Sequence, residues 1–87
     1  MLTVTEAASA HMAQMLSEAE APDDAALRII PGEGGLAVRV DSEHPGDATF
    51  AHEGKTVLVL DATMSESLAE RTLDVQDSGE GPRLTLA

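Results

Sequence analysis

The stretch from Ile29 to Val40 constrains the fold of this chain more than any other. An apolar run ends at Pro31-Gly32, and two further glycines follow within three residues. Side chains then alternate along residues 36–40, with leucine or valine at each even position. A period of two is typical of a half-buried strand, and glycine adopts turn conformations that other residues avoid. The stretch therefore predicts a strand–turn–strand unit around which a sheet is completed.

The other segments supply two helices and further strands. An apolar stripe with helical spacing runs through the first twenty residues, and Pro22 follows the expected helix end near Glu20. Residues 56–60 are apolar on both faces, which is typical of a central strand covered on both sides. Residues 25–30, 49–51, 72–76 and 83–87 also read as strands, and residues 61–68 as a short helix. The stripe of the long helix consists of Ala8, Met12, Met15 and Leu16.

Two threonine–glutamate pairs have the spacing of a helix capping box. Thr3 precedes Glu6 at the start of the long helix, where Thr5 is a second good N-cap residue. Thr63 precedes Glu66 in the same way, which predicts that Thr63 caps the short helix.

Runs of strands with segregated helices indicate an α+β fold. The expected architecture is a small β-sandwich of mixed strands with one N-terminal helix and one short helix. The length of 87 residues predicts one domain, spanning residues 1–87.

Charge and composition exclude several classes of function. The net charge of −11 opposes binding to nucleic acid or to an anionic membrane. No run approaches the roughly 18–20 apolar residues of a membrane span, and no basic region precedes an apolar one at the N-terminus, so the expected location is the cytoplasm. The chain has no cysteine, which rules out disulfides, Cys-ligated metals and cysteine nucleophiles.

Motifs for catalysis are missing from the sequence. The glycine-rich turn at residues 32–35 lacks the pattern of a phosphate-binding loop and is followed by a strand, and no G-x-S-x-G element is present. The sequence therefore predicts a protein that is not an enzyme and that has no catalytic residues. For a divalent metal such as iron, the candidate ligands are His44, Asp47 and His52, which bracket one short strand and combine imidazole with carboxylate. The alternative is that these polar loop residues are merely solvated and that no cofactor binds.

The order of these elements resembles the HesB/IscA-type proteins, the A-type iron–sulfur carriers and assembly scaffolds. The resemblance begins at Leu2-Thr3-Val4-Thr5-Glu6-Ala7-Ala8 and continues through Leu27-Arg28-Ile29 to the Gly34-Gly35 turn. Gly46-Asp47, Val57-Leu58-Val59 with the acid that follows, and Leu73-Asp74-Val75 with the late glycine turn complete it.

The family's cluster ligands are absent from this sequence. In the family a Gly-Gly-Cys-Ser-Gly element follows the first long strand, and the resemblance places Leu36 at its cysteine. The family's other two cysteines lie in a Cys-Gly-Cys tail that would begin near Ala87. The resemblance therefore implies a non-enzymatic accessory or interaction protein related to iron–sulfur cluster assembly, without Cys ligation of a cluster. Its expected partners are iron–sulfur assembly components, and its exposed edge strands are compatible with a homodimer.

Overall fold

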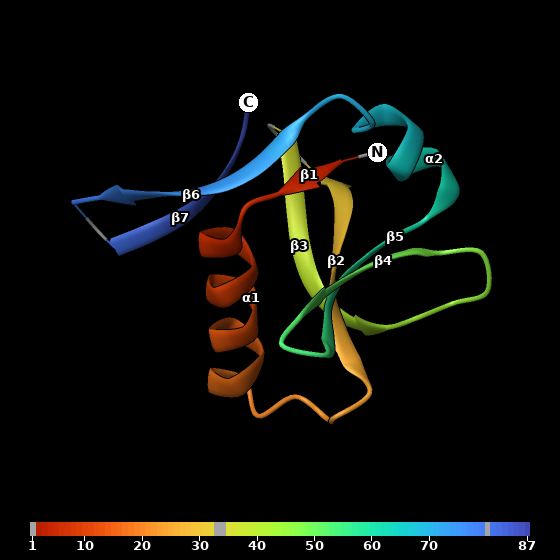
Figure 1. Cartoon of the computed structure of the whole chain (residues 1–87), viewed down its shortest axis with the longest axis horizontal. Coiled ribbons are helices and arrows are strands. Elements are labelled where there is room, and N and C mark those ends of the chain that lie inside the picture. Colours follow the sequence, from red (N-terminus) through yellow and green to blue (C-terminus); the bar gives the residue numbers. More distant parts are fainter. Residues whose placement is uncertain (1, 33–34, 80) are drawn as a thin grey trace.

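The computed structural model describes residues 2–32, 35–79 and 81–87, and it contains two helices and seven strands in α+β order (Figure 1). The sheets have mixed strand directions, as expected. In chain order the elements are β1 (Thr3–Val4), α1 (Glu6–Glu18), β2 (Ala25–Gly32), β3 (Gly35–Ser42), β4 (Ala48–His52), β5 (Lys55–Leu60), α2 (Ala62–Ser67), β6 (Thr72–Ser78) and β7 (Gly81–Leu86).

The strands form two sheets that share the core. The larger has the order β3-β2-β5-β4, with β2 and β5 parallel and the other pairs antiparallel. The smaller has the order β1-β6-β7, with β1 parallel to β6. Helix α1 contacts strands of both sheets, and α2 contacts β5 (Figure 1).

The strand–turn–strand unit predicted at residues 29–40 is confirmed as the β2–β3 hairpin. Its antiparallel register runs from Ala25 opposite Ser42 to Gly32 opposite Gly35. Residues 33 and 34, in the middle of the glycine-rich turn, lie outside the described part of the chain.

Strand β5 and helix α1 build most of the core, as the sequence predicts. Residues 57–60 are fully buried in an inner strand of the larger sheet. From α1, Ala8, Met12 and Leu16 are buried, whereas Met15 and His11 lie at its boundary.

The helix caps differ in part from the sequence prediction. Thr5 is the N-cap of α1, and its Oγ1 accepts a hydrogen bond from the Ala8 backbone N–H at 3.1 Å. The prediction for α2 was wrong, because Asp61 and not Thr63 is the N-cap, with its Oδ1 2.7 Å from the Met64 nitrogen. A carboxylate is a good N-cap because it accepts hydrogen bonds strongly and its negative charge is stabilised by the positive end of the helix dipole.

The alternating face of β3 is less buried than its pattern predicts. Val38 and Val40 lie opposite Ile29 and Leu27 and therefore share the core-facing side of the sheet. These two residues are nevertheless 38% and 44% exposed, because β3 is an edge strand with a neighbouring strand on one side only.

Candidate functional site

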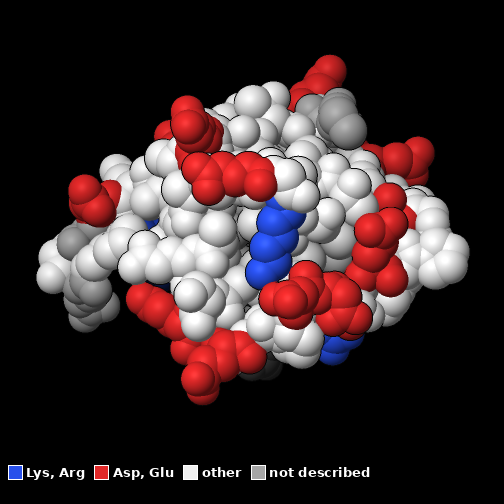
Figure 2. All heavy atoms as spheres, turned by 60° about the horizontal axis from the view of Figure 1, so that its bottom comes forward, with Lys and Arg blue, Asp and Glu red and all other residues white. Residues whose placement is uncertain are grey.

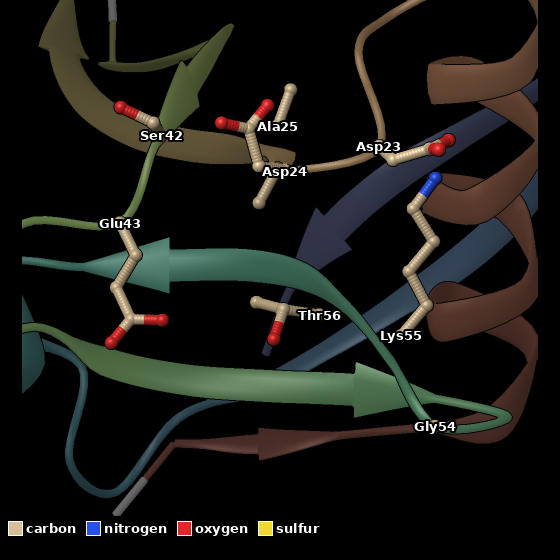
Figure 3. Close-up of a pocket in the computed structure, with 9 residues that line it drawn as sticks. Asp23, Asp24, Ala25, Ser42, Glu43, Gly54, Lys55 and Thr56 are labelled. Atoms are coloured by element: carbon tan, nitrogen blue, oxygen red, sulfur yellow. The ribbon is translucent and has the colours of Figure 1, made fainter.

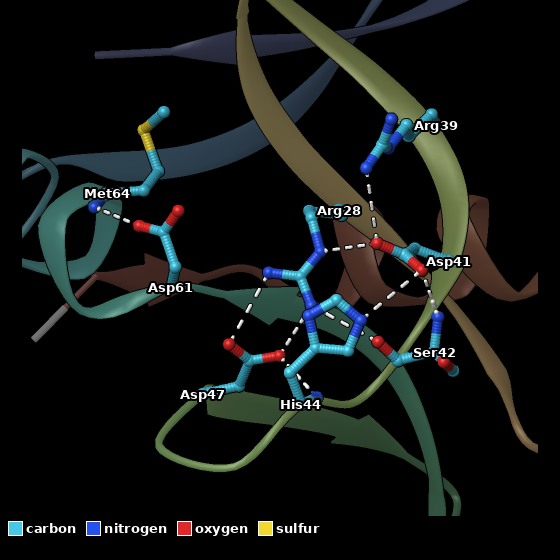
Figure 4. Close-up of polar contacts among 8 residues, drawn as sticks. All are labelled: Arg28, Arg39, Asp41, Ser42, His44, Asp47, Asp61 and Met64. Carbon is cyan, nitrogen blue, oxygen red and sulfur yellow. Dashed lines mark hydrogen bonds and ion pairs between the residues drawn. The ribbon is translucent and has the colours of Figure 1, made fainter.

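A buried arginine organises a cluster of charged and polar side chains (Figure 4). Arg28 lies in the middle of β2, and its side chain is only 6% exposed. Strand alternation directs it away from Leu27 and Ile29, toward the other face of the sheet. A guanidinium at this depth is stable only with charged or polar partners.

Two carboxylates and a carbonyl surround the Arg28 guanidinium. Its Nε lies 2.8 Å from Oδ2 of Asp41 at the end of β3, and its Nη2 donates to the Ser42 carbonyl at 3.1 Å. Asp47, in the loop between β3 and β4, is held by two parallel bonds, Nη2 to Oδ2 at 2.5 Å and Nη1 to Oδ1 at 3.4 Å. This fork geometry is the strong form of an arginine–carboxylate contact.

The same carboxylates also hold the backbone at the end of β3 and in the loop that follows it. Asp47 Oδ2 accepts from the His44 N–H, and Asp41 Oδ1 accepts from the Ser42 N–H, both at 2.8 Å. Arg39 and His44 approach Asp41 more loosely, at 3.5 and 3.7 Å. The cluster therefore ties β2, the end of β3 and the loop before β4 together.

These contacts shift the pKa of each charged partner toward its ionised form. The hydrogen bond to Arg28 is the main cause that lowers the pKa of Asp47, and the His44 N–H adds to it. The Ser42 N–H is the main cause that lowers the pKa of Asp41, followed by Arg28. The hydrogen bond to Asp47 is likewise the main cause that raises the pKa of Arg28.

The lowered carboxyl pKa values predict acid sensitivity. A depressed folded-state pKa contributes stability above the unfolded value of about 3.9, and this contribution is lost as pH falls through the folded value. We expect the urea concentration at the unfolding midpoint to decrease as the pH is lowered below about 4. The decrease should be less steep in Asp47→Asn, where one of these carboxyls no longer titrates. Urea unfolding at a series of pH values checks this, and an identical slope in both proteins contradicts it.

The three residues predicted as metal ligands do not form a cluster of donors. His44 and Asp47 share one loop, but Asp47 is occupied by Arg28 and by the His44 backbone, while the exposed His44 ring lies toward Asp41. His52 ends β4, where it pairs with Lys55 in the hairpin. Among the residues that the structure describes, no three His, Asp or Glu side chains gather so that they could hold a metal ion. Metal binding by these residues stays a prediction.

The sequence interpretation missed the roles of Arg28 and Asp41. A signal was present, since an arginine inside the apolar run of residues 25–30 needs acidic partners. Those partners lie 13 and 19 residues further along the chain, so only the sheet topology identifies them.

An open hollow of about 670 Å³ lies near this cluster, at the start of β2 and β5 (Figure 3). Asp23 and Lys55 lie at one end of it and Glu43 at the other (Figure 3). Its acidic character is shared with the surrounding surface, where Figure 2 shows acidic side chains spread around the face with few basic ones between them. The hollow is lined by Asp23, Asp24, Ala25, Ala26, Ser42, Glu43, Gly54, Lys55 and Thr56.

Solved structures share the arrangement of these elements. SufA from Escherichia coli, described as involved in the biosynthesis of iron–sulfur clusters, superposes with a TM-score of 0.77 at 23% identity, over 99% of this chain and 83% of its own. The chain has the fold of SufA. The crystal structure of IscA with a [2Fe-2S] cluster matches over 100% of this chain and 84% of its own, with a TM-score of 0.69 at 17% identity.

A solution structure of a protein from Aquifex aeolicus shares the SufA fold as well, with a TM-score of 0.69 at 24% identity over 99% of this chain and 89% of that one. No protein-family model and no curated protein sequence matches the chain. The α+β fold expected from the HesB/IscA resemblance is thus confirmed by these solved structures.

The residues present do not fit a Cys-ligated iron–sulfur cluster. Such clusters are held by thiolates, and the 87 residues include none. Leu36, which the resemblance places at one ligand position, lies opposite Pro31 in the β2–β3 ladder.

No helix in the described part of the chain is both long enough and apolar enough to cross a membrane.

Proposed function

We propose that this protein is a non-enzymatic accessory or interaction protein of iron–sulfur cluster assembly that does not ligate a cluster through cysteine. One observation carries the proposal: the fold of SufA and IscA is retained while the chain has no thiolate. On this proposal the chain acts through its surface, by contact with assembly proteins, and not through a bound cluster.

The cluster around Arg28 is structural, which is consistent with a protein that is not an enzyme. Its charged groups pair with one another, and among the described residues no buried side-chain nitrogen or oxygen lacks a hydrogen-bond partner. Charged groups whose hydrogen bonds are made within the protein stabilise a surface loop. Catalytic acids and bases instead need access to a substrate.

Affinity capture from the native cytoplasm tests the interaction role. The tagged protein is the bait, and an unrelated protein of similar acidity is the matched bait, because a net charge of −11 attracts basic proteins without specificity. We expect iron–sulfur assembly proteins to be enriched on the first bait only. Equal recovery on both baits, or specific enrichment of an unrelated machinery, contradicts the proposal.

The alternative function is a Cys-independent divalent-metal protein that uses His44, Asp47 and His52. Calorimetric titration with Fe²⁺ and Zn²⁺ separates the two proposals. Micromolar binding that disappears in the His44→Ala/His52→Ala double variant supports the alternative, and no heat at about millimolar metal rejects it. Asp47 is already paired with Arg28, so a metal ion that took Asp47 as a ligand would break that ion pair.

A further inference from the structure

Strand β3 has the most open edge of the four sheet edges that the structure describes. β1 has two residues, β4 carries a register irregularity between Phe50 and Ala51, and β7 includes Pro82. Short length, bulges and proline are the features that keep edge strands from pairing. β3 spans eight residues, its register opposite β2 is regular, and it contains no proline.

Two side chains of this edge strand are apolar and exposed. Val38 and Val40 are the large apolar residues with the highest exposure in the described part of the chain. An edge with free backbone groups and exposed valines is a template for another strand.

The charges on the opposite face of β3 determine which partner strand, in which register, can pair with it. Arg39 has a 61% exposed side chain, and Asp41 follows on the same face. In an antiparallel pair of identical strands, a two-fold axis through Val40 places Arg39 opposite the partner's Asp41, and Asp41 opposite the partner's Arg39. An axis through Arg39 or Asp41 would instead place like charges opposite each other, which is destabilising.

We infer that β3 pairs with β3 of a second copy of this chain, antiparallel and centred on Val40. The two larger sheets then become continuous across the two-fold axis. Val40 lies opposite the partner's Val40 on one face, while two reciprocal Arg39–Asp41 pairs lie on the other. Arg28 and the Ser42 N–H already fix the Asp41 carboxylate, so little ordering is needed on association.

The paired segment covers only residues 38–42, less than standard interfaces that bury about 1,200–2,000 Å². The net charge of −11 on each copy also opposes association, although salt at about 0.15 M screens charges beyond about 8 Å. We therefore expect a weak and reversible dimer. This inference does not depend on the proposed function, since it concerns the strand edge alone.

Sedimentation equilibrium up to about 1 mM protein tests the dimer. Arg39→Asp places two carboxylates opposite each other, whereas Arg83→Asp makes the same charge change on the β7 edge. We expect Arg39→Asp to raise the dissociation constant at least about tenfold and Arg83→Asp less than about threefold. A wild-type chain that stays monomeric, or equal effects of the two variants, overturns the inference.

Disulfide cross-linking of single introduced cysteines tests the register directly, because the chain has no cysteine of its own. Val40→Cys should form a disulfide-linked dimer under mild oxidation, since residues at the axis are close neighbours across the pair. Val38→Cys lies opposite the partner's Ser42 and should cross-link far less. Circular dichroism confirms that each variant is folded, and cross-linking of Val38→Cys equal to or above that of Val40→Cys overturns the register.

Discussion

Replacing Asp47 with alanine is expected to lower the free energy of unfolding by about 3 kcal/mol. The Asp47 side chain is 4% exposed and that of Arg28 6%, so the change leaves part of a buried guanidinium without its carboxylate. The His44 N–H loses its acceptor as well. Because Asp41 remains paired with Arg28, the cost lies at the lower end for a broken buried pair.

Chemical and thermal unfolding measure this effect. For a domain of this size, 3 kcal/mol corresponds to a melting temperature lower by about 15 °C. Asp47→Asn keeps an oxygen acceptor and should cost less, and Asp23→Ala at an exposed turn should stay within about 0.5 kcal/mol of the wild type. An Asp47→Ala protein as stable as Asp23→Ala would mean that the cluster does not hold the loop.

Truncation of Leu58 to alanine is expected to have an effect of about 3–4 kcal/mol. Leu58 is fully buried in β5, between Leu27 of β2 and Phe50 of β4. Because Leu27 and Phe50 are held in the strands paired with β5, they cannot move far enough to fill the space that the side chain leaves. The loss therefore includes both the transfer of the side chain and an unfilled cavity.

The matched control for this truncation is Leu58→Met, which conserves volume and should cost less than about 1.5 kcal/mol. Urea unfolding of the three proteins at pH 7 gives the comparison. If Leu58→Ala and Leu58→Met were equally stable, the inner strand would tolerate a cavity and would not be the centre of the core.

Local patterns in the sequence were sufficient to predict the β2–β3 hairpin and the central strand β5. Alternation and the glycine-rich turn define the hairpin, and an apolar run on both faces defines an inner strand. The exposure of Val38 and Val40 was not predictable in this way. Periodicity identifies a face, but only the strand order shows that β3 lies at an edge.

The polar cluster required the tertiary structure. Asp47 was selected from the sequence as a metal ligand, but the fold pairs it with Arg28, nineteen residues earlier. The cap of α2 was misassigned for a local reason, since Thr63–Glu66 has capping-box spacing while Asp61 makes the actual bond. Both cases show a carboxylate satisfying a donor that the sequence pattern alone does not locate.

Anaerobic reconstitution with iron and sulfide is the most direct test of the central claim, that this fold is retained without ligation of a cluster. SufA from Escherichia coli, treated in parallel, serves as the control that the reagents assemble a cluster. We predict that the purified chain gains no visible cluster absorbance and no protein-bound sulfide after desalting, because it offers no thiolate. A stable cluster spectrum that stays with the desalted protein would contradict the account.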